Sequence, residues 1–171
     1  MCIRDRDYPM GYEWFQLYLN GTHISNASAK EYDVVKNKIS KNIEKIYNSI
    51  SLILENSNLN MSDCFVMGFS QGGMMAFELG KILQKHLAGL AIISSRIISK
   101  EHEPNNAFLK TPIFISHGAQ DAVLPVSNYN ESLEVLKKYN FNYENYLIKT
   151  DEHTMSQETI TFFQNFIKKN I

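Results

Sequence analysis

The sequence predicts one α/β domain, built on a mostly parallel sheet with helices on both faces. Helix-like segments alternate with short apolar runs along the chain, which is the pattern of a parallel sheet covered by helices. The apolar runs are about four to eight residues long, which suits buried strands better than helices. Because strands twist in one sense, we expect right-handed connections between the parallel strands. All 171 residues are assigned to this single domain.

The first long helix is predicted from Asp33 onwards. Its apolar residues recur at intervals of three or four positions, which indicates one buried face. These residues are Val35, Ile39, Ile43, Ile46, Ile50 and Ile53. Residues 8–32 contain Pro9, Gly11 and Gly21, which interrupt regular structure, so an irregular segment is predicted there.

Four strands and three further helices are predicted after a polar break at Asn56–Asp63. The strands are Cys64–Met67, Leu87–Ser94, Pro112–Ser116 and Tyr143–Ile148. The helices follow Ser70, span Ser127–Tyr139 and close the chain at Ser156–Lys169. The polar stretch Ser99–Lys110 is predicted to be a loop.

The composition excludes several classes of protein. A net charge of −1 gives no basis for binding nucleic acid or an acidic membrane surface. No apolar run approaches the roughly 18 residues of a membrane span, so stable membrane insertion is not expected. Cys2 and Cys64 form no disulfide framework and lack metal-ligand spacing. Since no secretory signal is evident, we expect a cytoplasmic protein, with a homodimer as one alternative for its oligomeric state.

A serine lies between glycines in the segment Gly68-Phe69-Ser70-Gln71-Gly72, which fits the pattern G-x-S-x-G. A predicted strand precedes this segment and a predicted helix follows it, which is the context of a nucleophilic serine on a sharp turn. Such a turn needs a strained backbone and small residues two positions before and after the serine. Ser70 is therefore the candidate nucleophile. The alternative is a glycine-rich turn or phosphate-binding loop with an incidental serine.

A nucleophilic serine needs a general base, and the base needs an orienting acid. His153 follows the fourth predicted strand and is the candidate base; the alternative is a histidine in a surface loop. Asp121 follows the third strand and is the candidate acid, with a turn-forming aspartate as its alternative. Asp151 is a weaker candidate acid, and Glu101 and Glu103 are runners-up.

The other histidines fit this arrangement less well. His117 ends the third predicted strand before a glycine and is interpreted as a turn residue. His86 and His102 lie in polar segments and are predicted to be solvated. His23 precedes the serine, which is the wrong order for this arrangement of nucleophile, acid and base.

Three segments together resemble one family. "GFSQGGMMA", "HGAQDAVLPV" and "EHTMSQETITFFQNFI" are similar to motifs of the carboxylesterase/phospholipase family of α/β-hydrolases, which includes the acyl-protein thioesterases. The resemblance runs from about Trp14 to the C-terminus. It implies Ser70 as nucleophile, Asp121 as acid, His153 as base and the backbone N–H of Gln71 as one oxyanion donor. It also implies small acyl ester or thioester substrates, with no cofactor and no metal.

The chain departs from the family pattern at several places. Glu152 replaces a glycine before the histidine, and Ala122 replaces a proline after the acid. No L-H-G-x-G loop, which supplies the other oxyanion donor in the family, precedes Ser70. The opening segment "MCIRDR" matches nothing in the family, so we expect a non-native or disordered start at residues 1–7 and a partial domain that lacks the N-terminal strands. The strand Cys64–Met67 would then have an unpaired edge, and the chain would fold poorly and have little or no activity.

The predicted function is hydrolysis of carboxylic esters, as in carboxylesterases and lysophospholipases, through an acyl-enzyme. An acyl-protein thioesterase is one alternative. A dienelactone-hydrolase-like enzyme is another, although such enzymes usually carry cysteine where this chain has Ser70. An inactive fragment or a non-catalytic binding domain is the third. Trp14, Phe15 and Met155 are candidates for lining the acyl site, with ordinary packing as the alternative.

Overall fold

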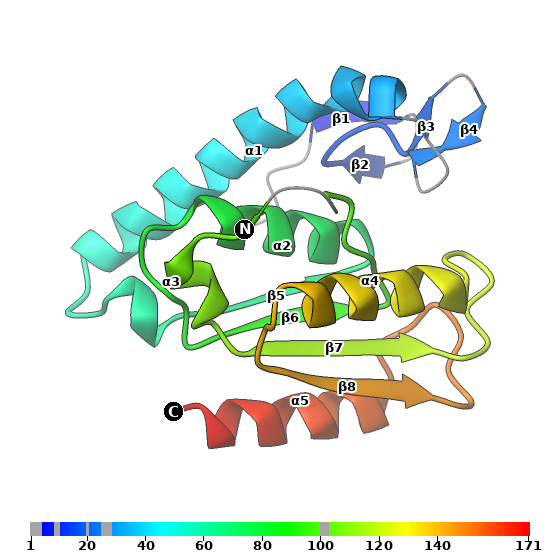
Figure 1. Ribbon diagram of the computed structural model, residues 1–171. Coiled ribbons are helices and arrows are strands. Elements are labelled where there is room, and N and C mark those ends of the chain that lie inside the picture. The colour runs from blue at the N-terminus through cyan, green and yellow to red at the C-terminus, as the bar shows by residue number, and fades with distance from the viewer. Residues whose placement is uncertain (1–4, 9–10, 20, 25–28, 100–102) are drawn as a thin grey trace. The chain divides into compact units, whose positions relative to one another are not determined.

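The computed structural model describes residues 5–8, 11–19, 21–24, 29–99 and 103–171 (Figure 1). The chain divides into two compact units, Met1–Asn56 and Ser57–Ile171. Of the predicted non-native start at 1–7, residues 1–4 lie outside the described residues, and residues 5–7 belong to a strand.

The first unit contains short strands followed by one long helix. The strands are β1 (Asp5–Tyr8), β2 (Gly11–Glu13), β3 (Tyr18–Leu19) and β4 (Thr22–His23), and the helix is α1 (Ala29–Glu55). β1 pairs antiparallel with β2, and β3 pairs antiparallel with β4. The prediction of irregular structure over residues 8–32 is therefore wrong in part. Strands of two to four residues are too short to show an alternating pattern in the sequence.

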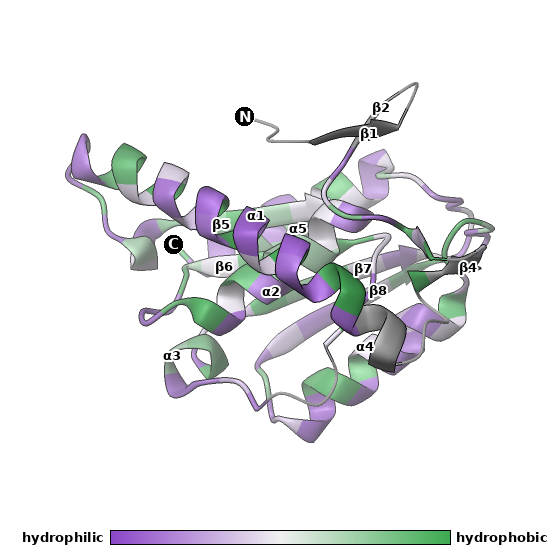
Figure 2. Cartoon of the chain, turned by 90° about the horizontal axis from the view of Figure 1, so that it is seen from above, coloured by the Kyte–Doolittle hydropathy of each residue, from purple (hydrophilic) through white to green (hydrophobic). Residues whose placement is uncertain are grey.

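Helix α1 has the predicted amphipathic pattern over most of its length. Val35, Ile39 and Ile43 are each 3% exposed, whereas Ile53 near the end of the helix is 66% exposed. Figure 2 shows hydrophobic and hydrophilic residues interspersed along the helix. The helix also makes a polar contact, because the side-chain amide of Asn42 donates a hydrogen bond of 2.6 Å to the backbone carbonyl of Trp14.

The second unit is built on four parallel strands in the order β5-β6-β7-β8. They are β5 (Phe65–Phe69), β6 (Gly89–Ile93), β7 (Ile113–Gly118) and β8 (Tyr143–Ile148). The helices are η2 (Met61–Asp63), α2 (Gln71–Ile82), α3 (Asn106–Leu109), α4 (Val126–Lys138) and α5 (Gln157–Lys169). The predicted order of strands and helices is confirmed, except that α3 lies inside the stretch predicted to be a loop.

Helix α3 forms because Asn105 caps its first turn. The side-chain oxygen of Asn105 accepts a hydrogen bond of 2.9 Å from the backbone N–H of Phe108. The ring of Phe108 is only 1% exposed and packs against the rings of Phe77 and Phe141. A single buried aromatic residue therefore stabilises one helical turn that has no helical period in the sequence.

Helices cover both faces of the sheet, as predicted. Helices α2 and α4 pack on one face, and α5 packs on the other against β7 and β8 (Figure 1). The α5 face has a core of Ala91, Ile93, Phe114 and Phe166. On the opposite face, Ile92 is completely buried. This arrangement gives both faces of the central strands an apolar cover, which explains their continuous apolar sequences.

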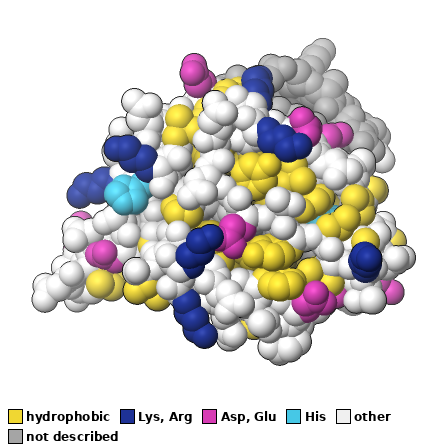
Figure 3. Space-filling view, turned by 60° about the horizontal axis from the view of Figure 1, so that its bottom comes forward, with side chains coloured by type: hydrophobic (Ala, Val, Ile, Leu, Met, Phe, Trp, Pro, Cys, Tyr) yellow, Lys and Arg dark blue, Asp and Glu magenta, His cyan; other side chains and the backbone are white. Residues whose placement is uncertain are grey.

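Strand β5 lies at one end of this strand order. Among the described strands it pairs only with β6, so its other edge has no strand partner there. Met67 and Phe69, which lie two positions apart on β5 and so share a face, are 46% and 38% exposed. Figure 3 brings the α5 side of the molecule forward and shows hydrophobic side chains gathered in the middle of that face.

Within the described residues, no helix combines the length and apolar character needed to cross a lipid bilayer.

Candidate active site

Ser70 occupies the turn between β5 and α2. Its φ of 52° and ψ of −123° lie outside the regions that non-glycine residues normally adopt, so the turn is strained as the sequence predicts. Backbone hydrogen bonds hold the strained residue on both sides. The N–H of Ser70 donates to the carbonyl of Ile93 at 2.9 Å, and the N–H of Gly73 donates to the carbonyl of Ser70 at 3.0 Å.

The glycines around Ser70 do not all have the same role. A Cβ on Gly68 would lie 2.1 Å from the backbone of Gly72, and a Cβ on Gly73 would lie 2.6 Å from the side chain of Ser95. A Cβ on Gly72 would meet no atom within 4 Å. The sequence predicted that the residues two positions before and two positions after Ser70 must both be small. This prediction is correct for Gly68 and wrong for Gly72. The close approach is one-sided, because Gly68 faces the start of the helix and Gly72 faces open space.

The structure brings Ser70, His153 and Asp121 into one chain of hydrogen bonds. Nε2 of His153 lies 3.0 Å from Oγ of Ser70, and Nδ1 lies 2.7 Å from Oδ2 of Asp121. These residues follow β5, β8 and β7, so all three lie at the carboxyl ends of parallel strands. A carboxylate only accepts hydrogen bonds, so in the neutral imidazole Nδ1–H donates to Asp121. Nε2 is then left to accept the hydroxyl proton of Ser70.

Asp121 uses its two carboxylate oxygens for different contacts. Oδ1 accepts hydrogen bonds from the backbone N–H groups of Val123 at 2.9 Å and Leu124 at 2.8 Å. Oδ2 contacts His153, and the side chain is completely buried. The side chain of Asp121 thus both forms a turn and contacts His153, and its role as the acid that orients a base stays a prediction.

His117 lies inside strand β7 and is buried, so its interpretation as a turn residue is wrong. A histidine followed by glycine ends an apolar run in the sequence, but the strand continues through both residues. Nε2–H of His117 donates to the carbonyl of Leu124 at 2.8 Å and lies 3.4 Å from Oδ2 of Asp121. Burial lowers the pKa of His117, although the hydrogen bond to Leu124 and the charge of Asp121 act in the opposite direction. His117 is therefore a neutral support for the loop that carries Asp121.

The loops after β7 and β8 interlock next to Gly118. A Cβ at this position would lie 2.3 Å from the carbonyl oxygens of both Asp151 and Glu152. The N–H of Gln120 donates to the carbonyl of Asp151 at 2.9 Å, and the N–H of Ala119 donates to a carbonyl at the end of β8. Sequence reasoning missed this role of Gly118, for which the His-Gly pair at the strand end is the only signal.

Of the alternative acids and histidines described in the second unit, Asp151, Glu103 and His86 make no hydrogen bond to Ser70. Asp151 is buried, yet within the described part of the chain its Oδ2 has no hydrogen-bond partner and it makes no hydrogen bond to His153. Glu103 and His86 are exposed, as predicted for His86. His23 is in β4, and Glu101 and His102 lie outside the described residues. Among the described residues, no three His, Cys, Asp or Glu side chains form a group that could hold a metal ion.

One aromatic side chain lies beside His153. The ring of Phe69 lies 5.0 Å from the ring of His153, and both Phe69 and Met155 are more than one third exposed. Phe15, one of the predicted acyl-site residues, is completely buried, which agrees with the packing alternative. Trp14 is half-buried.

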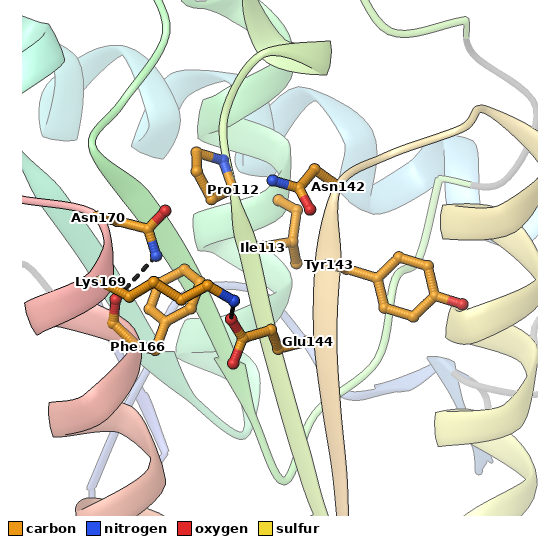
Figure 4. A pocket seen from close by; sticks show the side chains of 8 residues that line it. All are labelled: Pro112, Ile113, Asn142, Tyr143, Glu144, Phe166, Lys169 and Asn170. Carbon is orange, nitrogen blue, oxygen red and sulfur yellow. Dashed lines mark hydrogen bonds and ion pairs between the residues drawn. The ribbon is translucent and has the colours of Figure 1, made fainter.

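A small cleft lies at the opposite end of the strands (Figure 4). It is lined by residues at the starts of β7 and β8 and at the end of α5. Three of its polar side chains are paired: Lys169 contacts Glu144 at 2.6 Å, and the amide of Asn170 donates to the carbonyl of Phe166 at 2.8 Å. This cleft is separate from the hydrogen-bonded chain at the carboxyl ends of the strands.

The fold and the site together define the class of protein. A parallel sheet with helices on both faces, and a serine presented on a strained turn from a strand to a helix, are the defining features of the α/β-hydrolase fold. Within this class, the chain belongs to the phospholipase/carboxylesterase family, whose model matches residues 4–171.

Relatives and solved structures agree with this assignment. The chain is 27% identical over 158 residues to acyl-protein thioesterase 1 of Debaryomyces hansenii. The aligned region covers 90% of this chain and 65% of that protein. The crystal structure of Arabidopsis thaliana SOBER1 matches with a TM-score of 0.79 at 19% identity, over 93% of this chain and 74% of that chain. The crystal structure of esterase PE8 matches with a TM-score of 0.78 at 22% identity, over 95% and 72%. The chain thus spans between about half and two thirds of the length of the curated relatives it matches.

The one-sided contact at Gly68 predicts opposite effects for two similar substitutions. Gly68→Ala should lower the free energy of unfolding by about 1–3 kcal/mol, because its methyl group overlaps the backbone of Gly72. Gly72→Ala should raise it by about 0.5–1 kcal/mol, because alanine is the better helix former and the added methyl meets open space. Urea unfolding of the two variants measures both effects. Equal destabilisation by both would contradict this account of the turn.

The neutral state of His117 predicts a loss of stability in mild acid. Its pKa in the folded protein lies below the ordinary value near 6.5, so below that pH the unfolded chain binds a proton that the folded chain does not. Stability should therefore fall as pH falls from about 7 towards 5, by at most about 1.4 kcal/mol per pH unit from this group. His117→Gln should reduce this slope in urea unfolding series, whereas the exposed control His86→Gln should not. Identical slopes for all three proteins would rule out the effect.

Proposed function

We propose that this protein hydrolyses carboxylic esters, as carboxylesterases and lysophospholipases do, with Ser70 as nucleophile, His153 as general base and Asp121 as the orienting acid. One observation carries the proposal: a single imidazole lies within hydrogen-bond distance of both the serine hydroxyl and a buried carboxylate. This is the arrangement that activates a serine, since the base takes its proton while the acid holds the base in the required tautomer.

The proposed reaction has two halves. His153 takes the hydroxyl proton as Oγ of Ser70 attacks the acyl carbonyl, and Asp121 stabilises the imidazolium that results. The imidazolium then gives its proton to the departing alcohol, which leaves an acyl-enzyme. A water molecule, deprotonated by the same imidazole, attacks the acyl group, and Ser70 recovers its proton as the acid is released.

The backbone N–H of Gln71 is the proposed oxyanion donor. Gln71 is the first residue of α2, where the positive end of the helix dipole favours a developing negative charge. Family members add a second donor from an L-H-G-x-G loop that has no match before Ser70 in this chain.

The substrate class follows from the surroundings of His153 and from the relatives. The partly exposed ring of Phe69 beside the imidazole, and the exposed Met155 two residues after His153 in the sequence, suit an acyl chain. Thioester hydrolysis is the second candidate, because several relatives are named acyl-protein thioesterases and the same acyl-enzyme serves both reactions. A cytoplasmic location, the absence of a nucleic-acid partner and a homodimer stay predictions from the sequence.

Replacing the nucleophile tests the proposal directly. Ser70→Ala should abolish both labelling by a fluorophosphonate probe and hydrolysis of a p-nitrophenyl ester, because no other hydroxyl contacts His153 in the described part of the chain. Ser62→Ala, in η2 before β5, is the matched control and should label normally. Labelling of the Ser70→Ala protein at the rate of the unchanged protein would refute the assignment.

The choice between the two candidate acids can be tested by a matched pair of amides. Asp121→Asn keeps an oxygen for the N–H groups of Val123 and Leu124 but places a donor where Nδ1–H of His153 needs an acceptor. The turnover number kcat should fall by about 10⁴-fold while the fold is retained. Asp151→Asn should leave kcat nearly unchanged. Steady-state kinetics on both variants decides, and a larger loss for Asp151→Asn would reverse the assignment.

A further inference from the structure

We propose that two consecutive hydroxyl groups after β6 position the two reacting side chains. Ser95 holds the turn that carries Ser70, and Ser94 holds the loop that carries His153. This inference rests on the proposed function. Both serines are positioning residues, because each acts on the backbone beside a reacting group and touches neither the nucleophilic oxygen nor the imidazole.

Ser95 contacts the strained turn at two points. Its hydroxyl donates a hydrogen bond to the carbonyl of Ser70, and its side chain fills the space where Gly73 lacks a Cβ. Gly73 also donates its N–H to the same carbonyl. The carbonyl of a residue with a φ of 52° thus receives two hydrogen bonds, one from the helix that follows and one from the neighbouring strand end. Ser95 is 1% exposed, so water does not replace its hydroxyl.

Ser94 makes the corresponding contact with the loop after β8. Its hydroxyl donates to the carbonyl of Thr154 at 3.0 Å, one residue beyond His153 and 60 positions away in the sequence. Its N–H donates to the carbonyl of Ser116 in β7 at 2.9 Å. Ser94 also has a φ of 43°, which is unusual for a residue with a side chain. Strained residues of this kind persist where surrounding contacts hold them and cluster at functional sites.

The position of β6 explains why one dipeptide can serve both groups. β6 lies next to β5, which leads to Ser70, and β8 lies two strands away on the other side (Figure 1). The contact between Oγ of Ser70 and Nε2 of His153 therefore joins loops from the two outer strands. A misplacement of about 1 Å between reacting groups can cost about 100-fold in rate. Two hydroxyls on adjacent residues fix both loops to the same strand end.

Ser116 shows that a buried hydroxyl in this sheet does not by itself require a partner. It is in β7, 1% exposed, and its Oγ has no hydrogen-bond partner among the described residues. It therefore provides a matched control, since Ser116→Ala removes a hydroxyl of equal burial from the neighbouring strand without removing a hydrogen bond.

The test compares Ser94→Gly, Ser95→Ala and Ser116→Ala in the whole protein. We expect kcat for a p-nitrophenyl ester to fall about 10- to 100-fold in the first two variants, with little change in KM, and to stay unchanged in the third. Glycine accepts the backbone conformation of residue 94, so Ser94→Gly should keep the thermal midpoint of the unchanged protein. A loss of activity without a loss of stability separates positioning from a structural role.

A second measurement asks whether Ser94 acts through His153. In a His153→Ala background, Ser94→Gly should have no further effect on the residual hydrolysis, because the group that Ser94 positions is absent. The inference is overturned if Ser94→Gly and Ser95→Ala behave like Ser116→Ala, or if Ser94→Gly causes its full loss again in the His153→Ala background. Full activity in Ser70→Ala would instead refute the proposed function, so the two failures are distinguishable.

Discussion

The parallel pairing of β5 to β8 is the constraint on which the remaining arrangement depends. The strands pair in register over five or more residues at β5–β6 and β7–β8, with Phe69 opposite Ile93 and Gly118 opposite Ile148. Strands that run in one direction end at the same edge of the sheet, so the residues after them meet although they lie far apart in the sequence. Ser70 and His153, 83 positions apart, reach hydrogen-bond distance for this reason.

At that edge, backbone hydrogen bonds and glycines without a Cβ fix the positions of the loops. Gly68 lets the strand before Ser70 approach the start of α2, and Gly118 lets the strand before Asp121 approach the loop of His153. A Cβ at either position would overlap backbone atoms, which cannot move aside as a flexible side chain can. The strained conformation of Ser70 is held within this framework by hydrogen bonds to its own N–H and carbonyl. The fold itself therefore fixes the positions of Ser70 and His153 without a bound substrate.

The sequence predicted the parts of this arrangement that follow from local patterns. The period of apolar residues predicted the order of strands and helices, and the order of polar residues after strands predicted that Ser70, Asp121 and His153 would meet. The burial of His117 and the contacts of Ser94 were not predictable in this way. Their partners lie on other strands, so their roles depend on register and on the path of loops, which a single sequence does not encode in any local pattern.

Two histidines lie close to one carboxylate oxygen at this site, and their side chains differ in burial. Nε2 of His117 lies 3.4 Å from Oδ2 of Asp121, and Nδ1 of His153 lies 2.7 Å from the same oxygen. The side chain of His117 is completely buried, and burial lowers its pKa. The side chain of His153 is 18% exposed. In the proposed reaction His153 takes the proton of Ser70, and a neutral His117 leaves the charge of Asp121 to the imidazolium that results. His117 thus supports the proposed chemistry by remaining uncharged. A second imidazolium at His117 would weaken the stabilisation that the carboxylate of Asp121 gives to the imidazolium of His153.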